Sequence, residues 1–244
     1  MHVHSGQIMT DSDRPPQRPK ETNQTSLEIG CAPGKWMVFL AERIGYEVHG
    51  LEYLASAAET TRKNLAQCGV YGVVRSADFL SYESDERFDL VMSLGFIEHF
   101  ENYEDIFLKH LKLVREGGVL VLGLPRFRGV NYLIQAMIDP YMECPYLSSH
   151  FLPVMELNPF MKLADKHSLQ KVFVGYVGGF ERALFPTNEV TNGAMKLFVR
   201  MAIKLCAMFF GNFDSSLTSS YQIVILRKPQ ESEPRFKQAS PQGA

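Results

Sequence analysis

Short apolar runs alternate with segments of helical periodicity from residue 26 to residue 124, and this rhythm is the strongest constraint on the fold. Five runs of five or six residues have the composition of buried strands, at 26–30, 47–51, 72–76, 88–93 and 119–124. Between them, apolar residues recur at helical spacing at 35–44, 55–68 and 103–115. Such alternation is typical of βαβ units, whose parallel sheets are covered by helices on both faces.

The second half of the sequence has a looser pattern. Residues 126–157 predict a helix near 130–138, then an irregular insert rich in aromatic residues and proline, which serves either as a substrate pocket or as a satellite core. Two more helices (159–167 and 194–210) and two more strands (170–177 and 220–226) follow. We therefore expect one domain at 26–228, with a flexible polar arm at 1–25 and a flexible tail at 229–244.

Composition excludes several classes of protein. With 45% hydrophobic residues, the 244-residue chain can bury a sizeable core, and its net charge of -2 argues against a general nucleic-acid binder. The four cysteines are far apart and match neither a zinc pattern nor a disulfide framework, so we predict no metal site and a reducing, cytoplasmic location. No secretory signal and no uncharged apolar run long enough to span a bilayer is visible.

The turn after the first predicted strand, EIGCAPGKW, is rich in glycine and excludes two common nucleotide motifs. A phosphate-binding P-loop needs one more residue between its glycines and a hydroxyl where Trp36 stands. The dinucleotide fingerprint needs glycine where Ala32 stands. What remains is an acid followed by two spaced glycines, at Glu28, Gly30 and Gly34.

Three neighbouring segments add to this motif. Glu52 ends the second strand, 24 residues after Glu28, where a carboxylate can accept hydrogen bonds from both hydroxyls of a ribose. The third strand leads to Asp78 and Phe79. The fourth strand runs into the segment LGFIEHF, which contains His99.

Together these motifs, in this order over about residues 26–125, resemble the class I S-adenosylmethionine (SAM)-dependent methyltransferases, in particular the branch that acts on small molecules. The resemblance implies a Rossmann-like α/β fold, a seven-stranded sheet of order 3-2-1-4-5-7-6 with strand 7 antiparallel, flanked by helices. It implies SAM as cofactor, lying across the carboxyl ends of strands 1 to 4. The cofactor contacts that it implies are Glu28, Gly30, Cys31, Gly34, Glu52, Tyr53, Asp78, Phe79, Ser93, Leu94 and Gly95.

The resemblance also suggests individual roles. Glu52 would hold the ribose and Tyr53 would form a wall of the adenosine pocket, while Asp78 would accept from the adenine amino group and Phe79 would pack on its ring. His99 is the candidate catalytic base, because an imidazole can take a proton near neutral pH. A local structural hydrogen bond is the alternative role for His99.

The expected activity is methyl transfer from SAM to an oxygen, nitrogen or carbon atom of a small molecule. The alternatives are an RNA methyltransferase, a methyltransferase of lipid-linked substrates, and a non-catalytic module that binds SAM or a partner. The RNA alternative lacks the Asn/Asp-Pro-Pro-Tyr/Phe sequence after the fourth strand that a planar-amine methylase would have, and no basic excess supports it.

The predicted helix at 194–210 is apolar except for one basic stripe, formed by Lys196, Arg200 and Lys204. Two interpretations remain open for it. It is either a buried helix with one exposed edge, or a helix that makes peripheral contact with a membrane or a partner.

Overall fold

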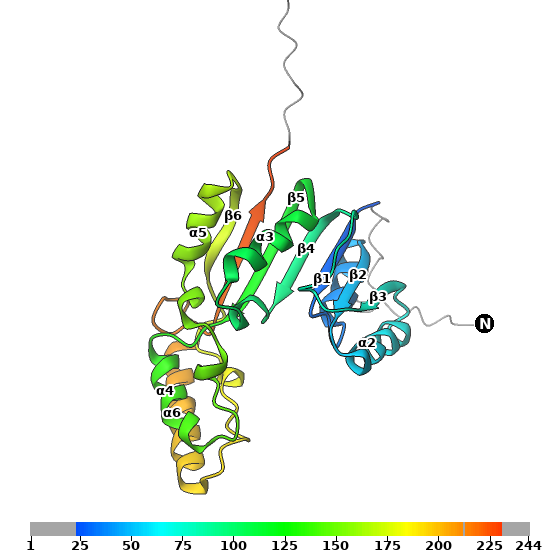
Figure 1. Ribbon diagram of the computed structural model, residues 1–244. Helices are drawn as coiled ribbons and strands as arrows, with labels where there is room; N and C mark the ends of the chain where they lie inside the picture. The colour runs from blue at the N-terminus through cyan, green and yellow to red at the C-terminus, as the bar shows by residue number, and fades with distance from the viewer. Residues whose placement is uncertain (1–22, 212, 231–244) are drawn as a thin grey trace, which may run out of the picture.

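The computed structural model describes residues 23–211 and 213–230 (Figure 1). Most of the predicted arm and tail lies outside these residues, so their flexibility stays a prediction. Seven strands form one sheet of order β3-β2-β1-β4-β5-β7-β6, in which β7 is antiparallel to both of its neighbours. This confirms the predicted fold class. The strands are β1 Thr25–Ile29, β2 Glu47–Glu52, β3 Gly72–Ser76, β4 Phe88–Leu94, β5 Val114–Pro125, β6 Gln170–Val177 and β7 Tyr221–Arg227.

The helices also follow the predicted pattern. They are α1 Lys35–Phe39, which continues as a π-helical turn at Leu40–Ile44, α2 Ala55–Gln67, α3 Tyr103–Leu113, α4 Val130–Ile138, α5 Leu157–Lys166 and α6 Gly193–Phe210. Strand β5 begins five residues earlier than predicted, because its pairing with β4 continues past an irregularity between Phe88 and Leu90. Gly117 lies within this stretch with a φ of 77°, and its N–H donates to the carbonyl of Lys228.

Alternate strand residues face opposite sides of the sheet, and helices cover both sides (Figure 1). On one side, Leu27 and Ile29 of β1 share a core with Phe107 of α3 and Phe160 of α5. On the other side, strand residues such as Val48 and Val74 pack with side chains of α1 and α2, including Met37, Ala58 and Leu65. The two cores together cover both faces of β2 and β4.

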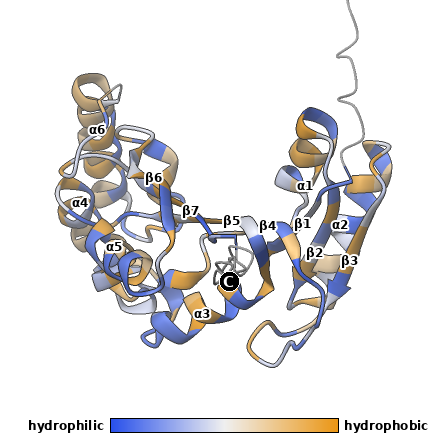
Figure 2. Cartoon of the chain, turned by 90° about the horizontal axis from the view of Figure 1, so that it is seen from above, coloured by the Kyte–Doolittle hydropathy of each residue, from blue (hydrophilic) through white to orange (hydrophobic). Residues whose placement is uncertain are grey.

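A third core lies beyond the sheet, where α4 and α6 pack together (Figures 1 and 2). Its buried members include Phe127, Ile134 and Ile138 from the insert region and Val199 and Ile203 from α6. The insert aromatics Tyr141 and Tyr146 pack against this cluster. Phe127, Tyr141 and Tyr146 of the insert therefore belong to a satellite core, while a role of the insert on the substrate side stays a prediction. Within the described ranges, no helix has the length and hydropathy needed to cross a bilayer.

Candidate active site

The parallel strands bring the glycine turn and the predicted acids to one edge of the sheet, because the carboxyl ends of β1, β2 and β4 meet there. Gly30 follows β1 with a φ of 71°, in the left-handed region that favours glycine, and its N–H donates to the carbonyl of Leu51 at 2.9 Å. A Cβ atom added at Gly30 would have Phe96 Cδ2, at 3.9 Å, as its nearest neighbour. The backbone at Gly30 is therefore open to a ligand.

Gly34 has a different reason to be glycine. Its φ is 94°, and a Cβ atom there would lie 3.0 Å from Cγ2 of Thr61 on α2. Its N–H donates to the carbonyl of Cys31 at 2.7 Å, which closes the turn before α1 begins. The second glycine of the motif therefore lets α2 pack closely against the turn.

Glu28 lies in β1 beneath this turn and is buried. Burial raises the pKa of its carboxyl to about 8, and a hydrogen bond from the backbone of Met37 opposes this shift. Glu28 Oε2 is buried and has no hydrogen-bond partner among the described residues. A buried carboxyl oxygen without a partner is costly, and a cationic or N–H group of a ligand would satisfy it.

Glu52 ends β2, and two backbone groups hold its carboxylate. Oε2 accepts from the Ala32 N–H at 3.3 Å, and Oε1 accepts from the Leu54 N–H at 3.2 Å. Each oxygen keeps a further acceptor position, so the carboxylate can still receive two hydroxyl groups. The neighbouring Tyr53 is largely exposed. Two residues after β3 ends, Asp78 Oδ1 accepts from the Leu80 N–H at 2.9 Å.

The side chains of two predicted contact residues, Phe79 and Ser93, lie in the interior beside His110. Phe79 is buried in the main core, where its ring packs against Phe96 and His110. Ser93 Oγ lies 3.0 Å from Nε2 of His110, while His110 Nδ1 lies 2.8 Å from the carbonyl of Ile106. A carbonyl only accepts, so Nδ1 carries the proton and the Ser93 hydroxyl donates to Nε2.

Burial keeps two interior groups, the His110 imidazole and the Cys31 thiol, in their neutral forms. It lowers the pKa of His110 to about 4, which keeps this imidazole neutral. Burial also raises the pKa of the Cys31 thiol to about 12, with a smaller contribution from the charges of Glu28 and Glu52. Cys31 is therefore a packed, unreactive thiol in the loop, with its backbone in the turn.

An apolar cavity of about 490 Å³ opens beside this edge, and Leu94 and Gly95 belong to its wall. The antiparallel β7 begins at the edge where β5 ends, since Tyr221 pairs with Pro125, and this brings the start of β7 into the wall. The remaining lining residues are Trp36, Gly123, Pro125, Val177, Tyr221, Gln222 and Ile223. Sequence reasoning missed these positions because they come from four separate elements, and the single Trp36 next to the glycine turn was the one available signal.

The turn after β4 places His99 beside His150 of the insert, with ring centroids 4.6 Å apart. His99 Nδ1 lies 3.1 Å from the carbonyl of Ser149, and His150 Nδ1 lies 2.6 Å from that of Tyr146. Each Nδ1 therefore carries a proton for its carbonyl, so in a neutral ring Nε2 is the basic nitrogen. Burial lowers the pKa of His150, so this imidazole is biased towards its neutral form.

Glu98 adds a carboxyl to this pair. It is buried, and burial raises its pKa to about 8 against smaller opposing effects of backbone hydrogen bonds. One ligand atom from each of Glu98, His99 and His150 lies within 4.8 Å of the other two, so the three side chains could together hold a metal ion. The sequence did not suggest this set, because Glu98 and His99 are separated from His150 by some fifty residues and no known spacing links them.

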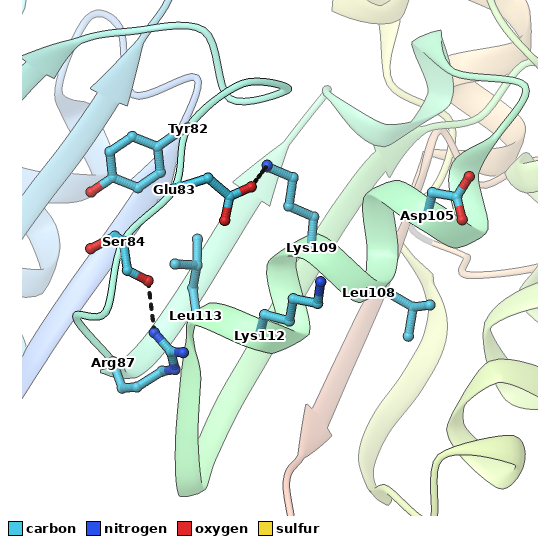
Figure 3. A pocket seen from close by; sticks show the side chains of 9 residues that line it. All are labelled: Tyr82, Glu83, Ser84, Arg87, Asp105, Leu108, Lys109, Lys112 and Leu113. Atoms are coloured by element: carbon cyan, nitrogen blue, oxygen red, sulfur yellow. Dashed lines mark hydrogen bonds and ion pairs between the residues drawn. The ribbon is translucent and has the colours of Figure 1, made fainter.

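A second cavity, of about 280 Å³, lies near the opposite edge of the sheet (Figure 3). It borders the amino ends of β4 and β5 and contains none of the predicted site residues. Lys109 Nζ lies 3.0 Å from Glu83 Oε1, and Arg87 donates to the carbonyl of Ser84 at 2.9 Å. The cavity is lined by Tyr82, Glu83, Ser84, Arg87, Asp105, Leu108, Lys109, Lys112 and Leu113.

The residues at the carboxyl edge fit a nucleoside cofactor that carries a positive charge. The backbone at Gly30 is open, Glu28 Oε2 has no partner among the described residues, and the Glu52 carboxylate is fixed with acceptor positions to spare. The adjoining apolar cavity could hold a second reactant.

Comparison with known proteins finds similarity to methyltransferases in both sequence and structure. Residues 27–118 match the family model described as a methyltransferase domain. The chain is 28% identical over 158 residues to a probable fatty acid methyltransferase of Pseudomonas putida, covering 59% of this chain and 39% of that protein. It is 29% identical over 110 residues to trans-aconitate 2-methyltransferase of Rhizobium etli, covering 45% and 41%. The chain thus spans about two fifths of the length of these curated relatives.

Solved structures extend the similarity of fold over most of the chain. Coclaurine N-methyltransferase, bound to N-methylheliamine and S-adenosylhomocysteine (SAH), matches with a TM-score of 0.59 at 18% identity, covering 84% of this chain and 68% of that one. A mycolic acid cyclopropane synthase complexed with SAH and CTAB also matches with a TM-score of 0.59, at 15% identity, covering 85% and 79%. Residues 27–118 thus match a methyltransferase domain, and the sheet order and the glycine turn with its acids agree with the fold of class I SAM-dependent methyltransferases.

Proposed function

We propose that the protein transfers a methyl group from SAM to a small, largely apolar acceptor. The observation that carries the proposal is the pairing, at one edge of the sheet, of the Gly30 turn and its acids with the adjoining apolar cavity. Relatives that are named as methyltransferases of a fatty acid and of trans-aconitate support a small-molecule acceptor. The methylated atom is an oxygen, a nitrogen or a carbon.

SAM, when bound, supplies a methyl group made electrophilic by its sulfonium. The residues of the chain then have to bind the cofactor and the acceptor, align them for the transfer and keep water out of the site. In this proposal Glu52 holds the ribose, Asp78 holds the adenine amino group, and Glu28 with the backbone at Gly30 holds the amino-acid part. Such positioning can contribute roughly 7–11 kcal/mol in favourable cases.

The cavity would hold the acceptor away from water, with Leu94 and Gly95 between the two reactants. His99 would remove the proton from a hydroxyl acceptor through Nε2, the nitrogen left free by the contact of Nδ1 with Ser149. Phe79 and Ser93 would support this edge from the core side, through their contacts with His110. Cys31 would contribute its backbone to the turn that holds the cofactor.

The cofactor assignment predicts micromolar binding of SAH and no binding of NAD. Titration calorimetry of the purified protein with each compound measures both. Binding of SAH alone would support the assignment and justify an acceptor screen with labelled SAM. Absence of SAH binding under these conditions would remove the proposed roles of Glu28, Glu52 and Asp78.

We also propose a cytoplasmic location. All four cysteines are free thiols, and two of them, Cys68 and Cys144, are exposed. Exposed free thiols persist in a reducing compartment and are uncommon in an oxidising one.

A further inference from the structure

Helix α6 turns an apolar face outward. Val199 and Ile203 are its buried residues and belong to the third core. On the other side, apolar side chains recur every three or four residues and are more than half exposed, with 65% exposure at Leu197 and 68% at Met208. The exposed set is Leu197, Phe198, Met201, Leu205, Met208 and Phe209. The interpretation of this helix as buried with only a basic edge exposed is therefore wrong, because the core covers just one narrow side of it.

A basic stripe borders this face. Lys196, Arg200 and Lys204 lie four residues apart, and the segment 190–213 contains no acidic residue. Lys196 Nζ donates to the carbonyl of Asn188 at 3.0 Å, and Arg200 Nη2 donates to the side-chain oxygen of Asn188 at 2.6 Å. Both partners are neutral, so the positive charges are not cancelled. A helix with a wide apolar face and flanking basic residues matches the surface of an anionic bilayer.

The end of α6 is hydrogen-bonded to a segment beside the apolar cavity. The Phe180 N–H donates to the carbonyl of Phe210, the last residue of α6, at 3.2 Å. Beside it, the Gly179 N–H donates to Asp214 Oδ1 at 2.8 Å. These contacts hold the segment that directly follows Val177, a residue of the cavity wall. The exposed face and the cavity thus belong to one connected part of the molecule.

We propose that the exposed face of α6 seats the protein on an anionic membrane surface, and that the acceptor is an amphiphile that enters the cavity from this surface. The acceptor part rests on the function proposed above, whereas the membrane contact does not. A second copy of the chain is a poorer occupant of the face. Two facing α6 helices would bring basic stripes together with no carboxylate on either helix to pair with them.

Vesicle co-sedimentation tests the membrane contact. The full-length protein should bind vesicles of equal parts phosphatidylglycerol and phosphatidylcholine at least about tenfold more tightly than vesicles of phosphatidylcholine, and salt should weaken this binding. The double variant Leu205→Glu, Met208→Glu should lose at least about tenfold in affinity, because it puts charges into the inserted face. Lys204→Gln should lose about fivefold on the anionic vesicles and nothing on the neutral ones.

Tyr71→Glu is the matched control, since Tyr71 is an exposed aromatic residue just before β3, at the other end of the sheet from α6 (Figure 2). It should bind vesicles as the wild type does. Unchanged far-ultraviolet circular dichroism of each variant shows that its fold is intact. The membrane proposal is overturned if the wild type binds neither vesicle, if the double variant binds like the wild type, or if light scattering shows a dimer that the double variant abolishes.

Trp36 allows a separate test of the acceptor class, because it is the single tryptophan of the chain and lines the cavity. A long-chain probe, 12-bromododecanoic acid, should quench its fluorescence saturably below the micellar concentration, while 3-bromopropionic acid should not. Val177→Phe, which narrows the cavity, should weaken the quenching at least about fivefold. Equal quenching by both probes, or no effect of the variant, would contradict an amphiphilic acceptor.

The two proposals fail in different ways. Vesicle binding without SAH binding would leave the membrane surface standing and remove the methyltransferase assignment. SAH binding without vesicle binding would leave the methyltransferase assignment standing and remove the membrane surface.

Discussion

Replacing His99 with alanine should lower the turnover of a hydroxyl acceptor by roughly 10²–10⁴-fold, the usual contribution of a general base. The physical reason is the contact of Nδ1 with the Ser149 carbonyl, which leaves Nε2 as the acceptor. The affinity for SAH should stay within about twofold of the wild type, because His99 is not among the proposed cofactor contacts. The measurement is transfer of label from SAM to the acceptor found in the screen, with SAH calorimetry alongside.

His99→Asn separates the catalytic role from a structural one. Asparagine can still donate to the Ser149 carbonyl but offers no basic nitrogen. Equal losses in both variants support the base. Recovery of activity in His99→Asn would mean that the hydrogen bond to Ser149 is what matters, and the base assignment would be withdrawn. Loss of wild-type activity on chelation with EDTA would instead favour a metal held by Glu98, His99 and His150.

The second large effect is expected at Glu52. Glu52→Ala should weaken SAH binding about 100-fold, since it removes two hydrogen bonds to a charged acceptor, worth about 1.5 kcal/mol each at the lower end. The loss should appear in calorimetry at constant pH and salt. Because the carboxylate also receives the N–H groups of Ala32 and Leu54, part of the loss comes from a loosened turn.

Two further variants test where the lost affinity for SAH comes from. Glu52→Gln keeps one acceptor oxygen and should lose less affinity than Glu52→Ala. Glu47→Ala removes an exposed acid at the start of the same strand, away from the carboxyl edge, and should bind SAH as the wild type does. An unchanged affinity of Glu52→Ala for SAH would rule out the ribose contact.

The local part of the site could be predicted from the sequence because its signals are local. The acid, the two glycines and the following helix lie within eight residues of one another, and left-handed turns at Gly30 and Gly34 require glycine. The order of strands followed from the resemblance, and the sheet confirms it. The acids of β1 and β2 lie at the same edge of the sheet because parallel neighbouring strands end there.

Side-chain direction within that edge was not predictable in the same way. Phe79 and Ser93 belong to the predicted contact set, yet the structure places both side chains in the interior beside His110. A residue at a strand end can face the core or the ligand, and the pleat with its covering helix decides which. Only packing against α3 settles this for Ser93.

Sequence by itself determined the α/β sheet, the glycine turn and the acids around it, since periodicity and turn chemistry act over a few residues. Tertiary structure decided the rest. The cavity draws its wall from Trp36, Val177 and Tyr221, which lie far apart in the chain, and His150 reaches His99 only through the folded insert. The exposure of the apolar face of α6 could not be predicted from the sequence either, because an apolar helix is buried or exposed according to what packs against it.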